Sequence, residues 1–209
     1  MNVKCIPCGM MQANCYIIED EKDAVIIDPG YIEPEIIDYI KENENKVKYI
    51  LLTHRHFDHV AAAVTLRKKT GAKIVVHKLD ECGLNDAEKS LANMWENDYE
   101  YPNSNSRADI LVAEGDIISA GNLKFSVIET PGHSEGGVCY ISQNLLFTGD
   151  TLFCGSIGRT DFFGSNAVDM VKSLKRLKAM PRDMVIYTGH GNSSTIGREI
   201  DSNIYLMQV

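Results

Sequence analysis

Thr53-His54-Arg55-His56-Phe57-Asp58-His59 is the stretch that decides the fold, and it follows a short apolar strand predicted over Val47–Leu52. It holds three of the six histidines of the chain, together with an aspartate. Imidazole nitrogens and carboxylate oxygens are common metal ligands, and at the end of a strand this spacing directs four donors at one small volume. The stretch therefore predicts a metal site on a loop that follows a strand.

Three later strand ends carry donors of the same kind. In each case an apolar run leads into a turn whose glycine is followed at once by His133, Asp150 or His190. Loops held by a rigid sheet are common places for functional side chains. The full set of candidate metal ligands is then His54, His56, Asp58, His59, His133, Asp150 and His190. Seven ligands suit two metal ions that share one carboxylate better than a single tetrahedral ion.

Around these loops, short β-branched and apolar runs predict strands, and apolar residues at helical spacing predict helices. The expected strands are Val3–Ile6, Asn14–Ile18, Ala24–Ile27, Val47–Leu52, Lys73–His77, Ile110–Val112, Ile117–Ser119, Leu123–Glu129, Gly137–Ile141, Asn144–Thr148 and Met184–Tyr187. The expected helices are Glu35–Ile40, His59–Lys69, Asn166–Met180 and Ser193–Tyr205. The polar segment Leu79–Arg107 predicts a small helical excursion and a loop, which we expect to act as a lid. Two strand-rich halves that each end in a helix predict an α/β fold, a four-layer αββα sandwich of two mixed sheets with the helices outside.

Length, charge and composition limit the possible functions. The 209 residues predict a single domain over residues 1–209. A formal charge of −8 argues against a nucleic-acid partner, because phosphate binding needs a basic surface. No apolar run approaches the ~20 residues of a membrane span, and the N-terminus lacks the apolar core of a signal peptide, so we expect a cytoplasmic protein. The six cysteines are then expected to be thiols.

The order His-x-His-x-Asp-His, followed by a histidine, an aspartate and a final histidine on later strand ends, resembles the signature of the metallo-β-lactamase superfamily. Other runs resemble its hydroxyacylglutathione hydrolase (glyoxalase II)-like branch: Gln12-Ala13-Asn14-Cys15-Tyr16, Val25-Ile26-Ile27-Asp28-Pro29-Gly30, Thr148-Gly149-Asp150-Thr151-Leu152-Phe153 and Gly158-Arg159-Thr160-Asp161. The resemblance covers essentially the whole chain and implies the metallo-β-lactamase fold. It also implies that His54, His56 and His133 hold one metal ion, that Asp58, His59 and His190 hold a second, and that Asp150 bridges them.

The same resemblance implies two divalent metal ions, zinc first, although nitrogen and oxygen donors also suit iron or manganese. A hydroxide that bridges two cations is nucleophilic at neutral pH and would attack an acyl carbon, while the cations stabilise the oxyanion and the leaving thiolate. We expect Asp58 to be both a ligand and the group that orients or deprotonates the water. The branch implies a small-molecule thioester substrate such as S-lactoylglutathione.

Two alternatives remain open. One is a mononuclear iron persulfide dioxygenase, which also carries the Gly-Arg-Thr-Asp run, and the other is a superfamily hydrolase of another ester or amide. Lactam hydrolysis is disfavoured, because class B lactamases place a cysteine in the second metal site. Full-length glyoxalase II adds a C-terminal helical domain with cationic contacts to glutathione, whereas this chain ends 19 residues after His190, so we expect a short form that lacks that domain.

A few further residues have roles that the sequence leaves open. Asp28 is either an Asx-turn residue or the acceptor for the imidazole N–H of a metal ligand. We expect His77 to be packed or exposed rather than a ligand. Arg159 and Asp161 are expected to form a structural ion pair beneath the site. The aromatic stretch Trp95–Tyr101 either lines the substrate cleft or forms a small core of its own.

Overall fold

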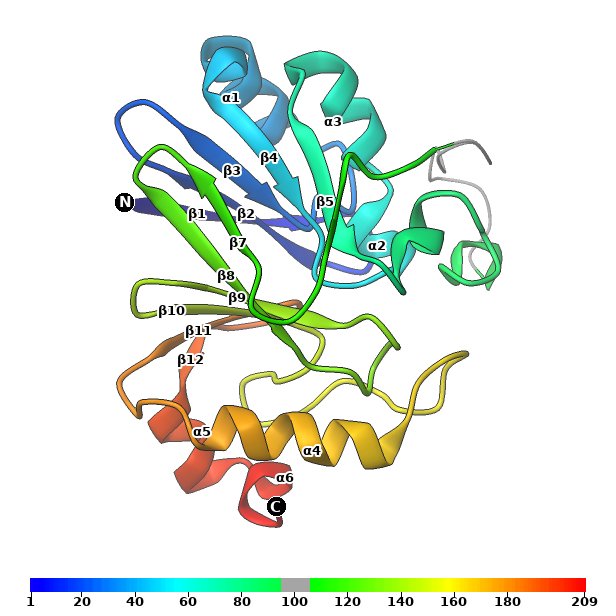
Figure 1. Cartoon of the computed structure of the whole chain (residues 1–209), viewed down its shortest axis with the longest axis vertical. Coiled ribbons are helices and arrows are strands. Elements are labelled where there is room, and N and C mark those ends of the chain that lie inside the picture. The colour runs from blue at the N-terminus through cyan, green and yellow to red at the C-terminus, as the bar shows by residue number, and fades with distance from the viewer. Residues whose placement is uncertain (95–105) are drawn as a thin grey trace.

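The structure is a computed structural model of the chain and describes residues 1–94 and 106–209. The strands of these residues form two six-stranded sheets that pack face to face, and helices cover both outer faces (Figure 1). The predicted four-layer αββα sandwich is therefore confirmed. Among the described residues, none of the helices has the length and apolar character that crossing a membrane requires.

The first sheet is mixed. Its strands, in spatial order, are β1 (Asn2–Cys8), β2 (Ala13–Glu19), β3 (Ala24–Ile27), β4 (Val47–Leu51), β5 (Lys73–His77) and β6 (Ile110–Val112). The first three pair antiparallel, and the strands from β3 to β6 pair in parallel. Parallel neighbours need a crossover, which is supplied first by α1 (Pro34–Asn43) and then by α2 (Phe57–Val60) and α3 (Ala63–Thr70).

The second sheet is mostly antiparallel. Its spatial order is β12 (Ser194–Thr195), β11 (Val185–Thr188), β10 (Leu145–Gly149), β9 (Val138–Ser142), β8 (Leu123–Glu129) and β7 (Ile117–Ala120). Only β10 and β11 pair in parallel within this described sheet, and α4 (Ala167–Lys178) crosses between them. Asn166 caps the N-terminus of α4, because its side chain accepts hydrogen bonds from the backbone N–H groups of Val168 and Asp169.

Strand β2 shows how burial on both faces builds the layers. Cys15 and Ile17 belong to the apolar cluster beneath α1 and α3, whereas Tyr16 and Ile18 belong to the cluster between the two sheets. Successive side chains of a strand point to opposite faces, so a strand covered on both faces is apolar at nearly every position. A third cluster packs α4 against the outer face of the second sheet.

Two predicted helices are wrong in extent. The helix expected over His59–Lys69 divides into α2 and α3, because the N–H of Ala62 donates to the carbonyl of Pro29 at 3.0 Å instead of continuing the helix. The helix expected over Ser193–Tyr205 begins as strand β12 and then divides into α5 (Ile196–Ser202) and α6 (Ile204–Met207). Asn203 is extended at that division, and its side chain caps α6.

The structure describes only part of the segment Leu79–Arg107, over which the sequence predicts a small helical region and a loop. Its described residues include two short 3₁₀ turns, Glu81–Leu84 and Ala92–Met94. The aromatic stretch Trp95–Tyr101 lies outside the described residues. The expected lid therefore stays a prediction.

Candidate metal centre

All the predicted metal donors lie at one edge of the sandwich, where strand ends of both sheets meet. Strand β4 ends shortly before His54, and α2 starts at the residue after His56. Strands β8, β10 and β11 end at or shortly before the donors of the second sheet, which are His133, Asp150 and His190. Within the described residues, three sets have ligand atoms within 4.8 Å of one another: His54, His56 and His133; Asp28, His54 and His59; and Asp58, His59 and His190.

The set of three histidines has unpartnered ring nitrogens. The Nε2 atoms of His54, His56 and His133 are buried and have no hydrogen-bond partner. A buried polar atom without a partner costs free energy, so three such atoms close together fit a bound cation. Burial, reinforced by neighbouring histidines, lowers the pKa of His54 and of His56 well below the usual histidine value. Both rings are therefore neutral, which is the form that binds metal.

The set of Asp58, His59 and His190 carries more charge. The Nε2 atom of His190 lies 3.3 Å from Oδ2 of Asp58 and 3.3 Å from Nε2 of His59. Burial alone would raise the pKa of Asp58, but His59 and His190 hold it well below its usual range. Burial alone would lower the pKa of His59, but the carboxylates of Asp58, Asp150 and Asp28 raise it to about 10. A cation that binds here must displace a proton from His59.

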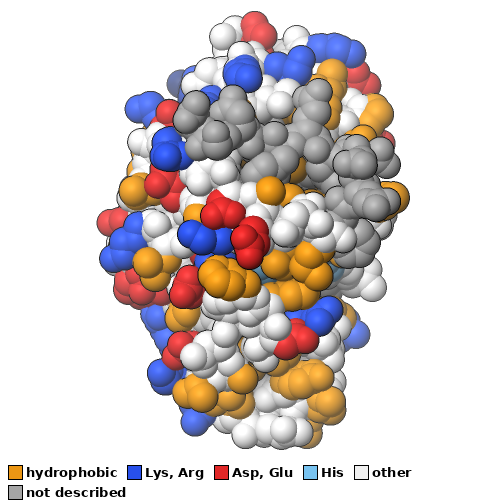
Figure 2. All heavy atoms as spheres, turned by 90° about the vertical axis from the view of Figure 1, so that its right-hand side faces the viewer, with side chains coloured by type: hydrophobic (Ala, Val, Ile, Leu, Met, Phe, Trp, Pro, Cys, Tyr) orange, Lys and Arg blue, Asp and Glu red, His pale blue; other side chains and the backbone are white. Residues whose placement is uncertain are grey.

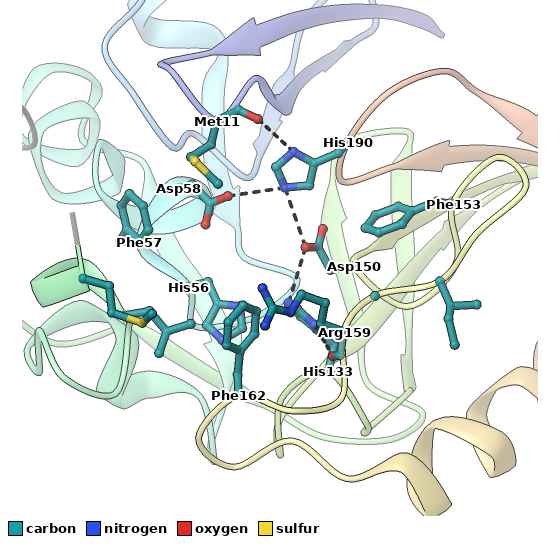
Figure 3. A pocket seen from close by; sticks show the side chains of 14 residues that line it. Met11, His56, Phe57, Asp58, His133, Asp150, Phe153, Arg159, Phe162 and His190 are labelled. Atoms are coloured by element: carbon teal, nitrogen blue, oxygen red, sulfur yellow. Dashed lines mark hydrogen bonds and ion pairs between the residues drawn. The ribbon is translucent and has the colours of Figure 1, made fainter.

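Asp150 lies between these two sets (Figure 3). Its Oδ2 atom is 3.3 Å from Nε2 of His133 and 3.6 Å from Nε2 of His190. Its Oδ1 atom is 3.4 Å from Nε2 of His59 and is buried without a hydrogen-bond partner. One carboxylate near both sets has the position that a bridging ligand needs.

Backbone carbonyls determine which ring nitrogen faces the centre. The Nδ1 atom of His133 donates to the carbonyl of Arg159 at 2.8 Å, and Nδ1 of His190 donates to the carbonyl of Met11 at 3.1 Å. A carbonyl oxygen can only accept, so Nδ1 carries the hydrogen in both rings. The Nε2 atoms are left free to bind a cation, in the orientation that such outer hydrogen bonds commonly impose on metal ligands.

Asp28, at the end of β3, orients two further rings. It accepts hydrogen bonds from the backbone N–H of Thr53 at 2.7 Å, from the Thr53 hydroxyl at 2.6 Å and from Nδ1 of His59 at 3.0 Å. Because the Thr53 hydroxyl donates to Asp28, it accepts from Nδ1 of His54, which lies 3.0 Å away. Of the two roles that the sequence left open for Asp28, the contact with the N–H of an imidazole is therefore present.

A cavity of about 350 Å³ opens onto the donors. Its other walls are largely apolar and consist of Met11, Phe57, Leu91, Met94, Phe153, Ile157 and Phe162. Figure 2 views this side of the molecule and shows a little histidine surface between hydrophobic side chains. Apolar walls with a few convergent polar groups are typical of a small-molecule site, and they limit the access of bulk water.

Arg159 adds a cation to the lining of this cavity. Its guanidinium lies 4.3 Å from the centre of the Phe162 ring and pairs with Asp161 at 2.8 Å. The predicted ion pair is present, but its expected place beneath the site is wrong, because both side chains are 65% exposed. The short loop holds this pair at the surface of the site, where Arg159 is accessible to an anionic group of a substrate.

Sequence reasoning missed Arg55 and Asp80, which hold the histidine loop from behind. The side chain of Arg55 is 1% exposed and donates to the carbonyl of Phe163 at 2.6 Å and to Glu135 at 3.1 Å. The buried carboxylate of Asp80 accepts from the backbone N–H of Arg55 at 3.1 Å and from the Ser134 hydroxyl at 2.5 Å. The position of Arg55 inside the metal stretch was a signal for it, whereas nothing local marks Asp80.

His77 lies outside the three donor sets of the described residues, as expected. It is buried, its Nε2 atom lies 2.9 Å from Oε1 of Glu129, and its Nδ1 atom accepts from the N–H of Leu79 at 3.3 Å. The six cysteines are free thiols, also as expected.

Comparisons with known proteins match this chain over most of its length. The family model described as the metallo-beta-lactamase superfamily matches residues 8–190. The chain is 34% identical to hydroxyacylglutathione hydrolase GloC of Haemophilus influenzae, over 99% of this chain and 98% of that protein. Among solved structures, BLEG-1 B3 metallo-β-lactamase has a TM-score of 0.90 at 34% identity, covering 98% of this chain and 99% of that one. The protein TTHA1623, solved in a di-iron-bound form, has a TM-score of 0.85 at 32% identity, covering 97% of this chain and 100% of that one.

Proposed function

Because this chain belongs to the metallo-β-lactamase superfamily, we propose that it is a dinuclear metal hydrolase of acyl thioesters from the glyoxalase II-like branch. The observation that carries the proposal is the pair of donor sets on either side of Asp150. We assign His54, His56 and His133 to one divalent ion, Asp58, His59 and His190 to the other, and Asp150 to both. Zinc is the first candidate, and the di-iron form of TTHA1623 supports iron as the second.

Divalent ions held by these residues would lower the pKa of water and polarise an acyl carbonyl. The chain itself positions the reactants. Asp58 is ionised and points into the cavity, so it can accept a hydrogen bond from the attacking water (Figure 3). Its low pKa makes it a weak base, so orienting the water is a better role for Asp58 than removing the proton. The apolar walls hold the acyl group and exclude competing water.

Two observations support a thioester as the substrate. The relative named hydroxyacylglutathione hydrolase is matched over 98% of its own length, so that protein extends little beyond the region that it shares with this chain. The cavity combines apolar walls with the accessible guanidinium of Arg159, which suits a small acyl group on an anionic thiol carrier. Hydrolysis of S-lactoylglutathione or of a related thioester is therefore the proposed reaction.

A second candidate substrate is a β-lactam or another amide. The structural similarity to BLEG-1 B3 metallo-β-lactamase, with a TM-score of 0.90, favours this alternative specifically. No cysteine lies in the three donor sets of the described residues, so this site differs from that of class B lactamases with a cysteine in the second metal site. Assay of a β-lactam beside the thioesters decides between the two substrate classes.

The test is to measure metal content and hydrolysis together. We expect two metal ions per chain and cleavage of at least one thioester from a panel that includes S-lactoylglutathione, with a β-lactam assayed alongside. The variant His54→Ala should lose metal and activity, and His77→Ala is the matched control outside the donor sets. A metal-replete protein that cleaves no thioester would contradict the proposal. One iron per chain with consumption of O₂ would indicate the dioxygenase instead.

A further inference from the structure

The turn Phe153–Ile157 forms one wall of the cavity. Leu152 and Ile157 form an antiparallel bridge at its base, and the N–H of Phe153 donates to the carbonyl of Ser156 at 2.9 Å. Phe153 and Ile157 both line the cavity. The ring of Phe153 stands edge-on to that of His190, with 6.0 Å between the ring centres (Figure 3). This wall therefore reaches the candidate metal ligands themselves.

Two buried polar residues, Glu199 in α5 and Asn203 between α5 and α6, hold this turn from outside the cavity. The Oε2 atom of Glu199 accepts from the N–H of Gly155 at 2.7 Å and from Nδ2 of Asn203 at 2.9 Å. The amide of Asn203 also donates to the carbonyl of Ser156 at 3.0 Å. The Ser194 hydroxyl donates to the other carboxylate oxygen of Glu199. Glu199 and Asn203 are both fully buried.

The position of the turn depends on this carboxylate. A buried carboxylate is stable only while hydrogen bonds satisfy it, and here they come from three different parts of the chain. Removing it leaves the N–H of Gly155 and the hydroxyl of Ser194 without their acceptor. Gly155 has a φ of 78°, a conformation that favours glycine.

The two sides of the cavity differ in chemistry. Phe153 lies on the side of His190, which has no Lys or Arg among the described lining residues, whereas Arg159, over the ring of Phe162, lies on the side of His133 (Figure 3). The reacting acyl carbon must lie against the candidate metal ligands between these two sides. The acyl group and the thiol carrier extend from that carbon in different directions, and the apolar side suits the acyl group.

We propose that the turn Phe153–Ile157 is the wall that selects apolar acyl groups and that Glu199 is the residue that positions it. The inference rests on the proposed thioester hydrolysis and narrows its substrate class. Within that class, the preferred substrates are thioesters with an apolar acyl group on an anionic thiol carrier, and S-lactoylglutathione, whose acyl group carries a hydroxyl, is a poorer substrate. Glu199 does not line the cavity, and it acts through Gly155.

The test uses a series of acetyl, butyryl and hexanoyl esters of one thiol. Glu199→Ala should raise KM for the hexanoyl ester by about tenfold, because contact with an apolar wall is lost, and should change kcat less. Glu199→Gln keeps an acceptor for Gly155 and should restore most of the preference. The double variant Glu199→Ala with Phe153→Ala should have a KM for the hexanoyl ester no higher than that of Phe153→Ala alone. The matched control is Asp201→Ala, which removes a 65% exposed carboxylate from the same helix and should leave the acyl preference unchanged.

Hydrogen exchange at the amide of Gly155 supplies a readout that needs no substrate. We expect protection in the unmodified protein and faster exchange in Glu199→Ala, with the amides of β10 and the metal content unchanged. An equal rise in KM for the acetyl, butyryl and hexanoyl esters in Glu199→Ala would overturn the inference. Unchanged hydrogen exchange at the amide of Gly155 would also overturn it. If the unmodified protein cleaves no thioester, the proposed function fails, and the exchange experiment still decides whether Glu199 holds the turn.

Discussion

The Nδ1 atom of His59 lies 3.0 Å from the Oδ2 atom of Asp28, a contact between residues 31 positions apart in the sequence. The same carboxylate orients His54 through the hydroxyl of Thr53. His54 and His59 belong to different candidate metal sites. A single side chain at the end of β3 therefore orients one donor of each.

Asp28→Asn should weaken metal binding. An amide cannot accept all three hydrogen bonds that the carboxylate now accepts, so the His54 and His59 rings lose their fixed orientation. Outer partners of metal ligands commonly contribute about 10–100-fold in metal affinity, and we expect a loss of that size in a metal titration. Asp38→Asn is the control, because the side chain of Asp38 is 70% exposed. Equal affinities in the two variants would contradict the role of Asp28.

Acidification should remove the metal ion of Asp58, His59 and His190 first. Burial lowers the pKa of His54 and of His56, so few protons compete with metal there. In the other set, carboxylates outweigh burial and raise the pKa of His190 and of His59, the latter to about 10. Binding there releases protons, so its apparent affinity falls about tenfold per pH unit for each proton as the pH drops.

Metal content measured after dialysis between pH 8 and pH 5.5 checks this order. We expect occupancy to fall from two ions to one before the second is lost, and proton release when metal-free protein is titrated at neutral pH. Simultaneous loss of both ions, or metal uptake without proton release, would show that the order is wrong.

Arg55→Ala should strongly destabilise the fold. The guanidinium is buried beside Asp80 and Glu135, and its loss leaves the carboxylate of Asp80 without a neighbouring cation. Removing one partner of a buried ion pair costs about 3–5 kcal/mol. We expect the free energy of unfolding, measured in urea, to fall by that amount. Arg55→Lys should recover only part of it, because an ammonium cannot reproduce the forked contacts with Glu135 and the carbonyl of Phe163. A loss no larger than that in exposed Arg159→Ala would contradict this prediction.

His77→Ala should lower stability without loss of metal. His77 is buried, and its hydrogen bonds go to Glu129 and to the backbone of Leu79 rather than to any candidate ligand. Loss of such hydrogen bonds costs about 1–3 kcal/mol. Metal analysis should still find the same content as in the unmodified protein. A loss of metal comparable to that of His54→Ala would place His77 in the centre.

Local sequence was sufficient to predict features that depend on a single turn or a single helix end. The donors that follow glycine turns at strand ends do lie together at one edge of the sandwich. Asn166 caps α4, and Gly71 ends α3 in the left-handed conformation with a φ of 72°, as their residue types predict.

Contacts between distant residues decided what the local patterns could not show. The helix expected from His59 onward breaks because Ala62 bonds to Pro29. The contact of Asp80 with the Arg55 backbone spans 25 positions, and that of Glu199 with Gly155 spans 44. Helical and strand periodicities relate only neighbours along the chain, so they carry no signal for such partners.

The sequence by itself determined the layers and the candidate ligands, because burial patterns and ligand chemistry are properties of residue types and their local spacing. Only the tertiary structure decided that Asp150 contacts both donor sets, that Asp28 orients rings in each, and that an apolar turn faces them. Those relationships depend on how the two sheets pack face to face, and no single segment contains that information.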